Sequence, residues 1–177
     1  MDYKPWFKYY SDKIPYEVKC FELPMKDLFI NCVNKSPDQT YLIYKDHTIT
    51  YKEANIAARK LADGLKKNGC KKNDRIAIMA PNIPQYVISI QACFKLGAIM
   101  VPVNPYYTSS ELDHILNDSK TDTIIIMDRF ADKVISIMES GKTAIRNVIV
   151  IDSGYSKDLL SNNRYSNILD YEKVLQS

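Results

Sequence analysis

VPVNPYYTSSELDHILNDSK, residues 101–120, is the stretch that decides the fold of this chain. It starts at the end of an apolar run, crosses a turn that contains Pro105 and two tyrosines, and enters a helix-forming sequence that Thr108 or Ser110 can cap. A strand, a turn and a capped helix in this order are typical of one step of a βα repeat. The stretch therefore predicts a doubly wound α/β domain.

Apolar runs of similar length recur on both sides of this stretch. Predicted strands lie at 75–80, 98–103, 123–127 and 147–151, and predicted helices at 84–96, 111–117 and 130–138. The strands are continuous in apolar residues and do not alternate with polar ones, which indicates burial on both faces. The predicted fold class is α/β, with a mostly parallel sheet built from βα units and helices on both faces. Asn82 is expected to cap the helix at 84–96, and Gly97 to end it.

The residues before this sheet predict a small N-terminal antiparallel hairpin between two helices. The first helix covers 25–34, the hairpin strands cover 41–44 and 48–51, and the second helix ends before Gly69. Thr50 to Glu53 reads T-Y-K-E, the pattern of a capping box, so Thr50 is expected to begin the second helix. His47 lies at the predicted tip of the hairpin, where a solvated turn residue is expected in preference to a ligand.

We predict that residues 1–177 form one domain, because the length suits one and no linker divides it. Its parts are an irregular aromatic arm at 1–23, a helix, hairpin and helix at 24–69, the parallel βα core at 74–152, and a loop and short helix at 153–177, with the helix at 168–175. Aromatic rings and lysines mix in the arm, so its rings are expected to anchor it across the protein surface. Contact with nucleic acid or with a partner subunit is the alternative for the arm.

The composition argues against several classes of protein. The 24 basic and 21 acidic side chains give a net charge of +3 and are interleaved, so no nucleic-acid surface is expected. No apolar run approaches the roughly 18 residues of a transmembrane segment, and no signal peptide is visible, so a cytoplasmic protein is expected. The four cysteines show neither C-x-x-C spacing nor neighbouring His, which argues against a disulfide framework or a zinc site. Cys32 and Cys93 lie in apolar helical patterns and are expected to be small buried hydrophobes.

Ligands of a doubly wound sheet usually bind beyond the carboxyl ends of its strands. Neither G-x-G-x-x-G nor G-x-S-x-G occurs there, which argues against a dinucleotide site and a hydrolase. Asp128 and Asp152 each follow a strand; capping or turn formation is expected, with a metal site or an acid–base pair as the alternative. The loop at 104–108 is likewise expected to act structurally, with ligand contact as the alternative.

Two further patterns look like functional sites but are interpreted as structural. Gly64 to Gly69 has the glycine spacing of a phosphate loop, yet Cys70 stands where that loop requires Lys, so helix capping is expected. His114 lies one turn after Glu111, and a contact between them on a solvated face is expected in preference to catalysis.

Several short motifs, taken in order, resemble those of one enzyme family. They are DRIAIMAPN at 74–82, NPYYTSSELDHILNDS at 104–119, TYKE at 50–53, and the opening WFKYY at 6–10 followed by IPYEV at 14–18. Together they resemble the long-chain fatty-acid–CoA ligases of the AMP-forming class, within the adenylate-forming enzymes. The similarity covers residues 4–128 well and residues 147–152 weakly.

The resemblance implies an acid–thiol ligase that converts a fatty acid, ATP and CoA into acyl-CoA, AMP and pyrophosphate. It implies ATP, Mg²⁺ and CoA for a full-length enzyme and no cofactor in the present residues. The phosphate loop of that family, of the type T-S-G-T-T-G-x-P-K-G, and the Lys of its C-terminal domain are absent from this sequence. We therefore assign no catalytic, cofactor-binding or metal-binding residue and expect these residues alone to be inactive.

The chain is thus expected to be the N-terminal portion of a longer enzyme. The resemblance implies that the remainder of that chain is its main partner and that a fatty acid is the substrate. A homodimer is left as an open alternative for the oligomeric state. Coumarate–CoA ligases and luciferase-like enzymes share the N-P-x-Y-T loop, so another adenylate-forming ligase is one alternative. A stand-alone, non-catalytic α/β binding module is the other, because no catalytic motif is present.

Overall fold

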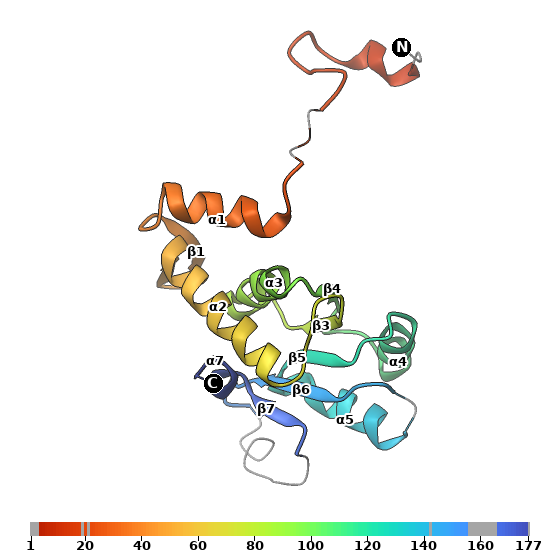
Figure 1. Ribbon diagram of the computed structural model, residues 1–177. Coiled ribbons are helices and arrows are strands. Elements are labelled where there is room, and N and C mark those ends of the chain that lie inside the picture. Colours follow the sequence, from red (N-terminus) through yellow and green to blue (C-terminus); the bar gives the residue numbers. More distant parts are fainter. Residues whose placement is uncertain (1–3, 19, 21, 142, 156–165, 177) are drawn as a thin grey trace.

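A computed structural model describes residues 4–18, 20, 22–141, 143–155 and 166–176 of the chain (Figure 1). The helices are η1 (Pro5–Tyr9), α1 (Met25–Lys35), α2 (Tyr51–Lys67), α3 (Pro84–Leu96), α4 (Ser109–Asp118), η2 (Asp128–Phe130), α5 (Ala131–Glu139) and α7 (Tyr171–Gln176). The strands are β1 (Thr40–Tyr44), β2 (His47–Thr50), β3 (Arg75–Met79), β4 (Ile99–Pro102), β5 (Thr123–Met127), β6 (Asn147–Ile151) and β7 (Ile168–Asp170).

The core of the protein is a parallel sheet of five strands in the order β4-β3-β5-β6-β7 (Figure 1). All of its neighbouring strand pairs are parallel, and β1 and β2 form a separate antiparallel hairpin, so the predicted fold class is confirmed. One row of apolar residues crosses the sheet from Ile78 through Ile125 and Ile149 to Leu169. This register aligns the ends of the central strands.

The side chains of the sheet are shared between two layers of helices. Ile76 and Ile78 of β3 belong to the cluster that α2, α3 and α7 cover, whereas Ala77 and Met79 belong to the cluster that α4 and α5 cover. Successive residues of a strand point to opposite faces, so a strand between two helical layers needs apolar residues at every position. The predicted helices on both faces are confirmed.

Capping boxes begin two of the helices. The Glu53 amide donates to Thr50 Oγ1 at 3.2 Å, and the Thr50 amide donates to the Glu53 carboxylate at 2.8 Å. Thr108 and Glu111 make the same reciprocal pair at the start of α4, with distances of 3.3 and 2.8 Å. Each box satisfies amides that the first turn of a helix leaves without an acceptor. The cap of α4 is therefore Thr108, one of the two residues that the sequence left open.

The two capping carboxylates predict a loss of stability in acid. The amides of Thr50 and Thr108 hold the pKa of Glu53 and of Glu111 below the ordinary value of 4.5. Each box therefore stabilises the fold above pH 4.5 and loses its contribution as the pH falls through the lowered pKa. We expect the double variant Glu53→Gln/Glu111→Gln to show a shallower fall in unfolding free energy, measured by urea denaturation between about pH 6 and pH 3. An unchanged slope would contradict this.

A buried thiol predicts a second loss of stability, in alkali. Cys93 is fully buried beneath α2, and this burial, with a smaller contribution from Cys70, raises its pKa from 9.0 to about 12. The unfolded thiol ionises near pH 9 while the folded one stays protonated, so the stability is complete below pH 9 and falls as the pH rises toward 12. Urea denaturation of Cys93→Ala is expected to show a shallower fall above pH 9, whereas Cys32→Ala, at an exposed thiol, should keep the slope of the parent chain. Equal slopes in all three proteins would refute this.

The prediction of a short helix at 168–175 is wrong for its first three residues. Ile168–Asp170 is the strand β7, which pairs in parallel with Val148, Ile149 and Val150 of β6, and α7 begins at Tyr171. Three residues are too few to show a periodicity of their own. Their conformation is set by the unpaired backbone groups that β6 offers at the edge of the sheet.

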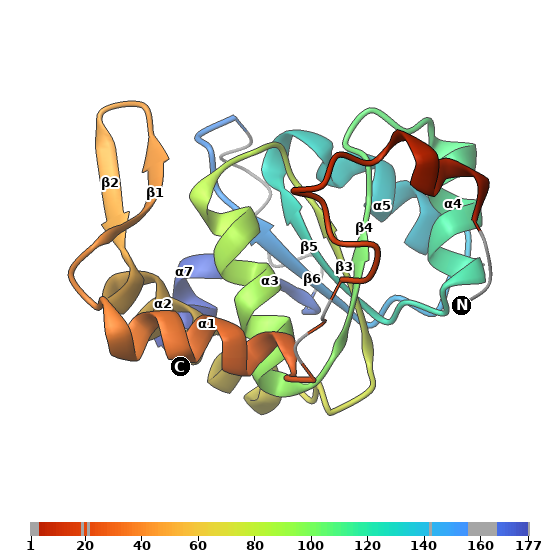
Figure 2. The same ribbon diagram turned by 90° about the horizontal axis from the view of Figure 1, so that it is seen from above.

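The hairpin is confirmed, with its second strand shifted by one residue. His47 is the first residue of β2 and lies opposite Tyr44, so it belongs to a strand and not to the predicted turn. Tyr51 begins α2, because Thr50 is the capping residue of that helix. Figure 2 shows the hairpin standing out from the body of the molecule beside α1.

Two residues of the helices differ from their predicted roles. Asn82 does not cap α3; Ile83 occupies that position without a side-chain bond, and Pro84 follows as the first helical residue. Proline has no amide hydrogen, so this helix start has one donor fewer to satisfy.

Cys32 is exposed, because α1 turns Phe29 and Val33 inward, whereas Cys93 is buried as predicted. Gly97 ends α3 with a left-handed φ of 72°, also as predicted.

The aromatic arm does not lie across the protein surface as predicted. Figure 1 shows its described part extending away from the sheet and its helices. Its rings pack on one another: Phe7 and Tyr16 have centroids 4.6 Å apart, and Tyr10 stacks on Tyr16 at 6.1 Å. Trp6 remains 52% exposed. Because the rings find partners within the arm, they do not anchor it to the body.

Candidate functional site

The loops that follow β4, β5 and β6 lie at the same edge of the sheet, because these strands are parallel (Figure 1). We call the loops at 104–108, 128–130 and 152–155 the carboxyl edge. The sequence identified this edge as the place for a ligand, and the structure joins its last two loops through one side chain, Asp128.

Asp128 is the buried centre of the carboxyl edge, with only 2% of its surface exposed. Its Oδ2 accepts hydrogen bonds from the amides of Ser153 and Tyr155 at 3.1 and 3.0 Å. Its Oδ1 accepts from the Ser153 hydroxyl at 2.5 Å and from the Arg129 amide at 2.7 Å. A buried carboxylate is stable when hydrogen bonds of this kind satisfy its oxygens. Asp128 therefore fixes the loop after β6 to the end of β5.

An arginine lies between two aromatic rings on the outer side of this centre. The guanidinium carbon of Arg129 is 5.5 Å from the ring centroid of Phe130 and 5.6 Å from that of Tyr155. Tyr106 meets Phe130 edge to face at 6.3 Å. Tyr106 and Tyr155 are 83% and 70% exposed. The carboxyl edge thus presents a cation and aromatic faces to its surroundings, which suits binding or packing of another group.

The loop after β4 is held from the other side by Lys133 of α5. The Lys133 ammonium donates to the carbonyl of Tyr107 at 2.7 Å and to that of Pro105 at 3.5 Å. Asn104 Oδ1 accepts from the Tyr106 amide at 3.0 Å, which forms a tight turn. These bonds hold the backbone of this loop in place, while the ring of Tyr106 meets only Phe130 among the described rings and remains largely exposed.

The carboxyl edge contains no paired acid and base. Asp152 is exposed and accepts from the Gly154 amide at 2.7 Å, so it forms a turn as the sequence predicted. Asp128 instead binds Ser153 and Tyr155 of the loop after β6, a long-range role that the sequence did not predict. Among the described residues, no group of three or more His, Cys, Asp or Glu could hold a metal ion.

The other candidate residues lie at a helix end or on the surface. The helix α2 ends just before Gly69, which has a left-handed φ of 89°. The Cys70 amide then donates to the Leu65 carbonyl of the last helical turn at 3.0 Å. The predicted capping role of Gly69 is confirmed. His47 and His114 are exposed on the surface. The expected contact between His114 and Glu111 is replaced by the capping bond of Glu111 to Thr108.

Sequence reasoning missed the contacts of Arg129, Lys133 and Tyr155. Arg129 directly follows the strand-end Asp128, so its place at the edge was visible in the sequence. Tyr155 was not, because its position depends on the hydrogen bond that its own amide donates to Asp128.

A doubly wound sheet with ordered loops at its carboxyl edge is the architecture of many ligand-binding α/β enzymes. The AMP-binding enzyme model matches residues 29–171, and this chain belongs to that family. It is 34% identical over 134 residues to a long-chain-fatty-acid–CoA ligase of Bacillus subtilis, covering 76% of this chain and 24% of the relative. It is 30% identical over 174 residues to that of Escherichia coli O157:H7, covering 97% of this chain and 31% of the relative.

Solved structures carry the same fold. A mutant coronafacic acid ligase from Pectobacterium brasiliense superposes with a TM-score of 0.78 at 22% identity, covering 88% of this chain and 29% of that protein. The chain thus spans 24% and 31% of the length of the two fatty-acid ligases from B. subtilis and E. coli. Within the described residues, no helix is long and apolar enough to cross a membrane.

Proposed function

We propose that these residues form the N-terminal scaffold of a long-chain fatty-acid–CoA ligase. The observation that carries the proposal is the near-complete alignment of this chain, at 30% identity, with the fatty-acid ligase of E. coli O157:H7. The full-length enzyme would join a fatty acid to CoA through an acyl-adenylate, with ATP as the source of the adenylate. The scaffold would contribute a rigid carboxyl edge against which the nucleotide-binding parts pack.

The contacts of the carboxyl edge support the proposed scaffold role. The polar atoms of Asp128 and Lys133 form hydrogen bonds that hold loops in place. The side chains that face outward are those of Tyr106, Arg129 and Tyr155. Groups that face outward from a rigid edge can pack against a second lobe or a ligand between the lobes. Catalysis would then require the phosphate loop and the C-terminal Lys that the family resemblance implies.

A split-enzyme assay tests this proposal. The 177-residue chain is incubated with palmitate, ATP and CoA, alone and after coexpression with the part of the E. coli ligase that lies beyond the aligned segment. We expect no palmitoyl-CoA from the chain alone and fatty-acid-dependent palmitoyl-CoA from the pair. Synthesis by the chain alone would overturn the scaffold role. A folded chain that never complements would favour the stand-alone binding module.

A second candidate is a ligase for another carboxylic acid. The superposition with coronafacic acid ligase shows only the fold, which enzymes with different acids share. The same split-enzyme assay, run with the matching part of the coronafacic acid ligase and its acid, distinguishes the two. Complementation there, together with failure in the fatty-acid pair, would support the second candidate.

A further inference from the structure

A hollow of about 670 Å³ opens at the amino ends of the strands, on the opposite side of the sheet from the carboxyl edge. It lies between the second half of α2, the loop that leads to β3 and the last turn of α3. The charged residues that line it are Arg59, Asp63, Lys66, Lys71, Lys72 and Lys95. We call it the basic hollow. Its size falls within the range of small-molecule sites, roughly 300–1,000 Å³.

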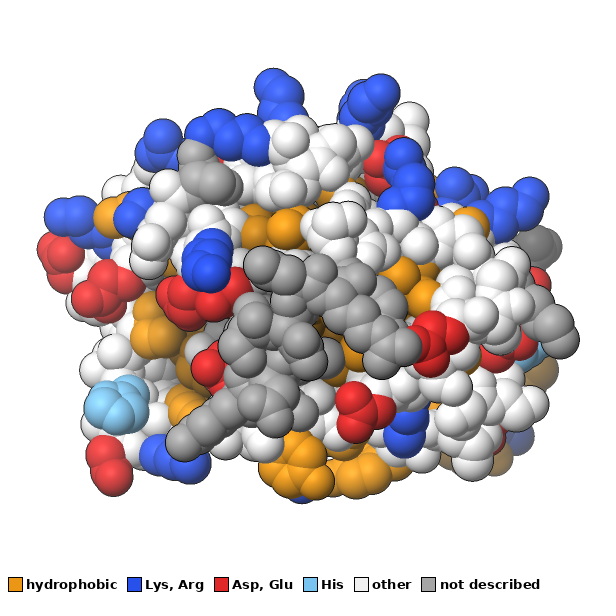
Figure 3. Space-filling view, turned by 90° about the horizontal axis from the view of Figure 1, so that it is seen from below, with side chains coloured by type: hydrophobic (Ala, Val, Ile, Leu, Met, Phe, Trp, Pro, Cys, Tyr) orange, Lys and Arg blue, Asp and Glu red, His pale blue; other side chains and the backbone are white. Residues whose placement is uncertain are grey.

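The residues that line the basic hollow carry an excess of positive charge. Five cations face a single carboxylate, that of Asp63. None of the five cations forms an ion pair with any residue that the structure describes. Figure 3 shows Lys and Arg side chains gathered along one rim of the molecule, in contrast to the mixed charges elsewhere on that face. A concave surface of one sign concentrates the electrostatic potential and attracts counter-ions.

Lys95 carries part of this positive charge in a half-buried position. This burial and then the positive charge of Arg59 lower the pKa of its ammonium group. Its Nζ lies 5.6 Å from the ring centroid of Phe29, a weak partner compared with a carboxylate. The attraction of a bound anion would offset both the repulsion from Arg59 and the cost of burying this ammonium group.

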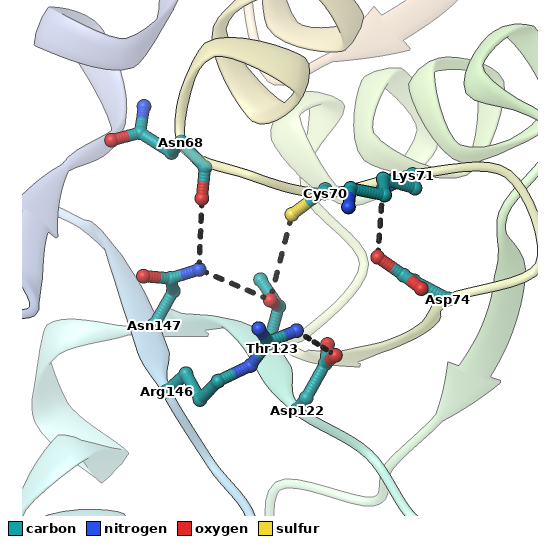
Figure 4. A network of polar contacts seen from close by, with 8 residues as sticks. All are labelled: Asn68, Cys70, Lys71, Asp74, Asp122, Thr123, Arg146 and Asn147. Carbon is teal, nitrogen blue, oxygen red and sulfur yellow. Dashed lines mark hydrogen bonds and ion pairs between the residues drawn. The ribbon is translucent and has the colours of Figure 1, made fainter.

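The wall of the basic hollow is fixed by a polar network at the amino ends of the strands (Figure 4). Cys70 Sγ lies 3.5 Å from Thr123 Oγ1, and the Asn147 side chain donates to the Asn68 carbonyl at 3.2 Å. The Lys71 amide donates to the Asp74 carboxylate at 2.7 Å. Because these bonds hold the loop from Asn68 to Asp74 against the sheet, the backbone that carries the cations is ordered before a ligand arrives.

A second hollow of about 480 Å³ continues the first. The two share Lys72, Lys95 and Leu96. The second is also lined by Lys26 and by apolar side chains that include Met25 and Phe94. An anion with an attached apolar or aromatic group could therefore place its charge in the basic hollow and its apolar group in the second hollow.

We propose that the basic hollow binds a phosphate-bearing small molecule through its ammonium and guanidinium groups. A phosphate or pyrophosphate group has several acceptor oxygens and more than one negative charge, so it can bind cations from α2, α3 and the intervening loop together. A single carboxylate would leave most of this charge unbalanced. The site lies at the opposite edge from the carboxyl edge and does not depend on the ligase activity proposed above.

Isothermal titration calorimetry with sodium pyrophosphate at about 0.1 M ionic strength tests the proposal. We expect saturable binding to the 177-residue chain and a loss of about tenfold or more in affinity for Lys72→Gln/Lys95→Gln. The matched control, Lys35→Gln/Lys52→Gln, removes the same charge from exposed positions outside the hollow and should bind within about twofold of the parent. No saturable binding, or equal losses in both variants, would overturn the proposal.

A second measurement serves if the variant of the hollow fails to fold. Acetylation of the unmodified chain is followed by mass spectrometry with and without pyrophosphate, and protection of Lys72 and Lys95 beyond that of Lys35 and Lys52 is expected. Equal protection at all four sites contradicts the proposal. Cosedimentation with phosphatidylglycerol vesicles in the absence of any pyrophosphate binding would assign the hollow to a membrane surface and also refute it.

Discussion

Replacing Gly64 with Ala is expected to destabilise the protein by about 2–4 kcal/mol, although Ala is the better helix former. A Cβ atom at this position would lie 2.0 Å from the carbonyl oxygen of Val174 and 2.7 Å from its Cγ1. The gain in helix propensity is only about 1 kcal/mol. The overlap is with backbone, so α7 must move away from α2, and the burial of Tyr171 and Val174 is lost with it, at roughly 2 kcal/mol for each large side chain.

The unfolding free energy from urea denaturation, together with amide hydrogen exchange in α7, measures this effect. Lys60→Ala on the exposed side of the same helix is the control and should change the unfolding free energy by less than about 0.5 kcal/mol. If Gly64→Ala were as stable as the parent chain and kept the amides of α7 protected, the close contact between α2 and α7 would be disproved.

Asp128→Ala is expected to cost about 2–4 kcal/mol and to release the loop after β6. The change removes the acceptor of three backbone amides, those of Arg129, Ser153 and Tyr155, and of the Ser153 hydroxyl. Hydrogen bonds to a buried charged group contribute more than neutral ones, and their donors would be left without a partner. The cost of Asp128→Asn should lie between zero and that of Asp128→Ala, because the side-chain amide keeps one acceptor oxygen.

The control for this prediction is Asp152→Ala. Asp152 is exposed and accepts from the Gly154 amide, so its loss should cost about 0.5 kcal/mol. Urea denaturation gives the stabilities, and hydrogen exchange at Ser153 and Tyr155 shows whether the loop has opened. Similar costs for Asp128→Ala and Asp152→Ala would show that the buried carboxylate is not the centre of the carboxyl edge.

The periodic elements were predictable because their causes are local. Continuous apolar runs such as TIIIM at 123–127 indicate strands with two buried faces, and the T-x-x-E patterns at Thr50 and Thr108 mark helix starts through bonds within four residues. The same local reasoning placed the candidate ligand edge, since the carboxyl ends of parallel strands must meet. It also excluded a phosphate loop at Gly64 to Gly69.

The remaining features could not be predicted because they depend on residues far apart in the chain. Strand β7 exists because β6 offers it a free edge, and Asp128 binds Ser153, which lies 25 residues later in the chain. The basic hollow combines lysines from two helices and a loop, which look in sequence like ordinary solubilising residues. Charge imbalance is a property of their arrangement in space.

The sequence by itself determined the α/β class and the capping box at Thr50, because periodicity and capping act over a few residues, and its ordered motifs pointed to the enzyme family. Only the tertiary structure decided which glycine is irreplaceable, which carboxylate is buried and where cations remain unbalanced. These properties arise when distant segments exclude water from the same place, and the free energy of a polar group depends on that exclusion.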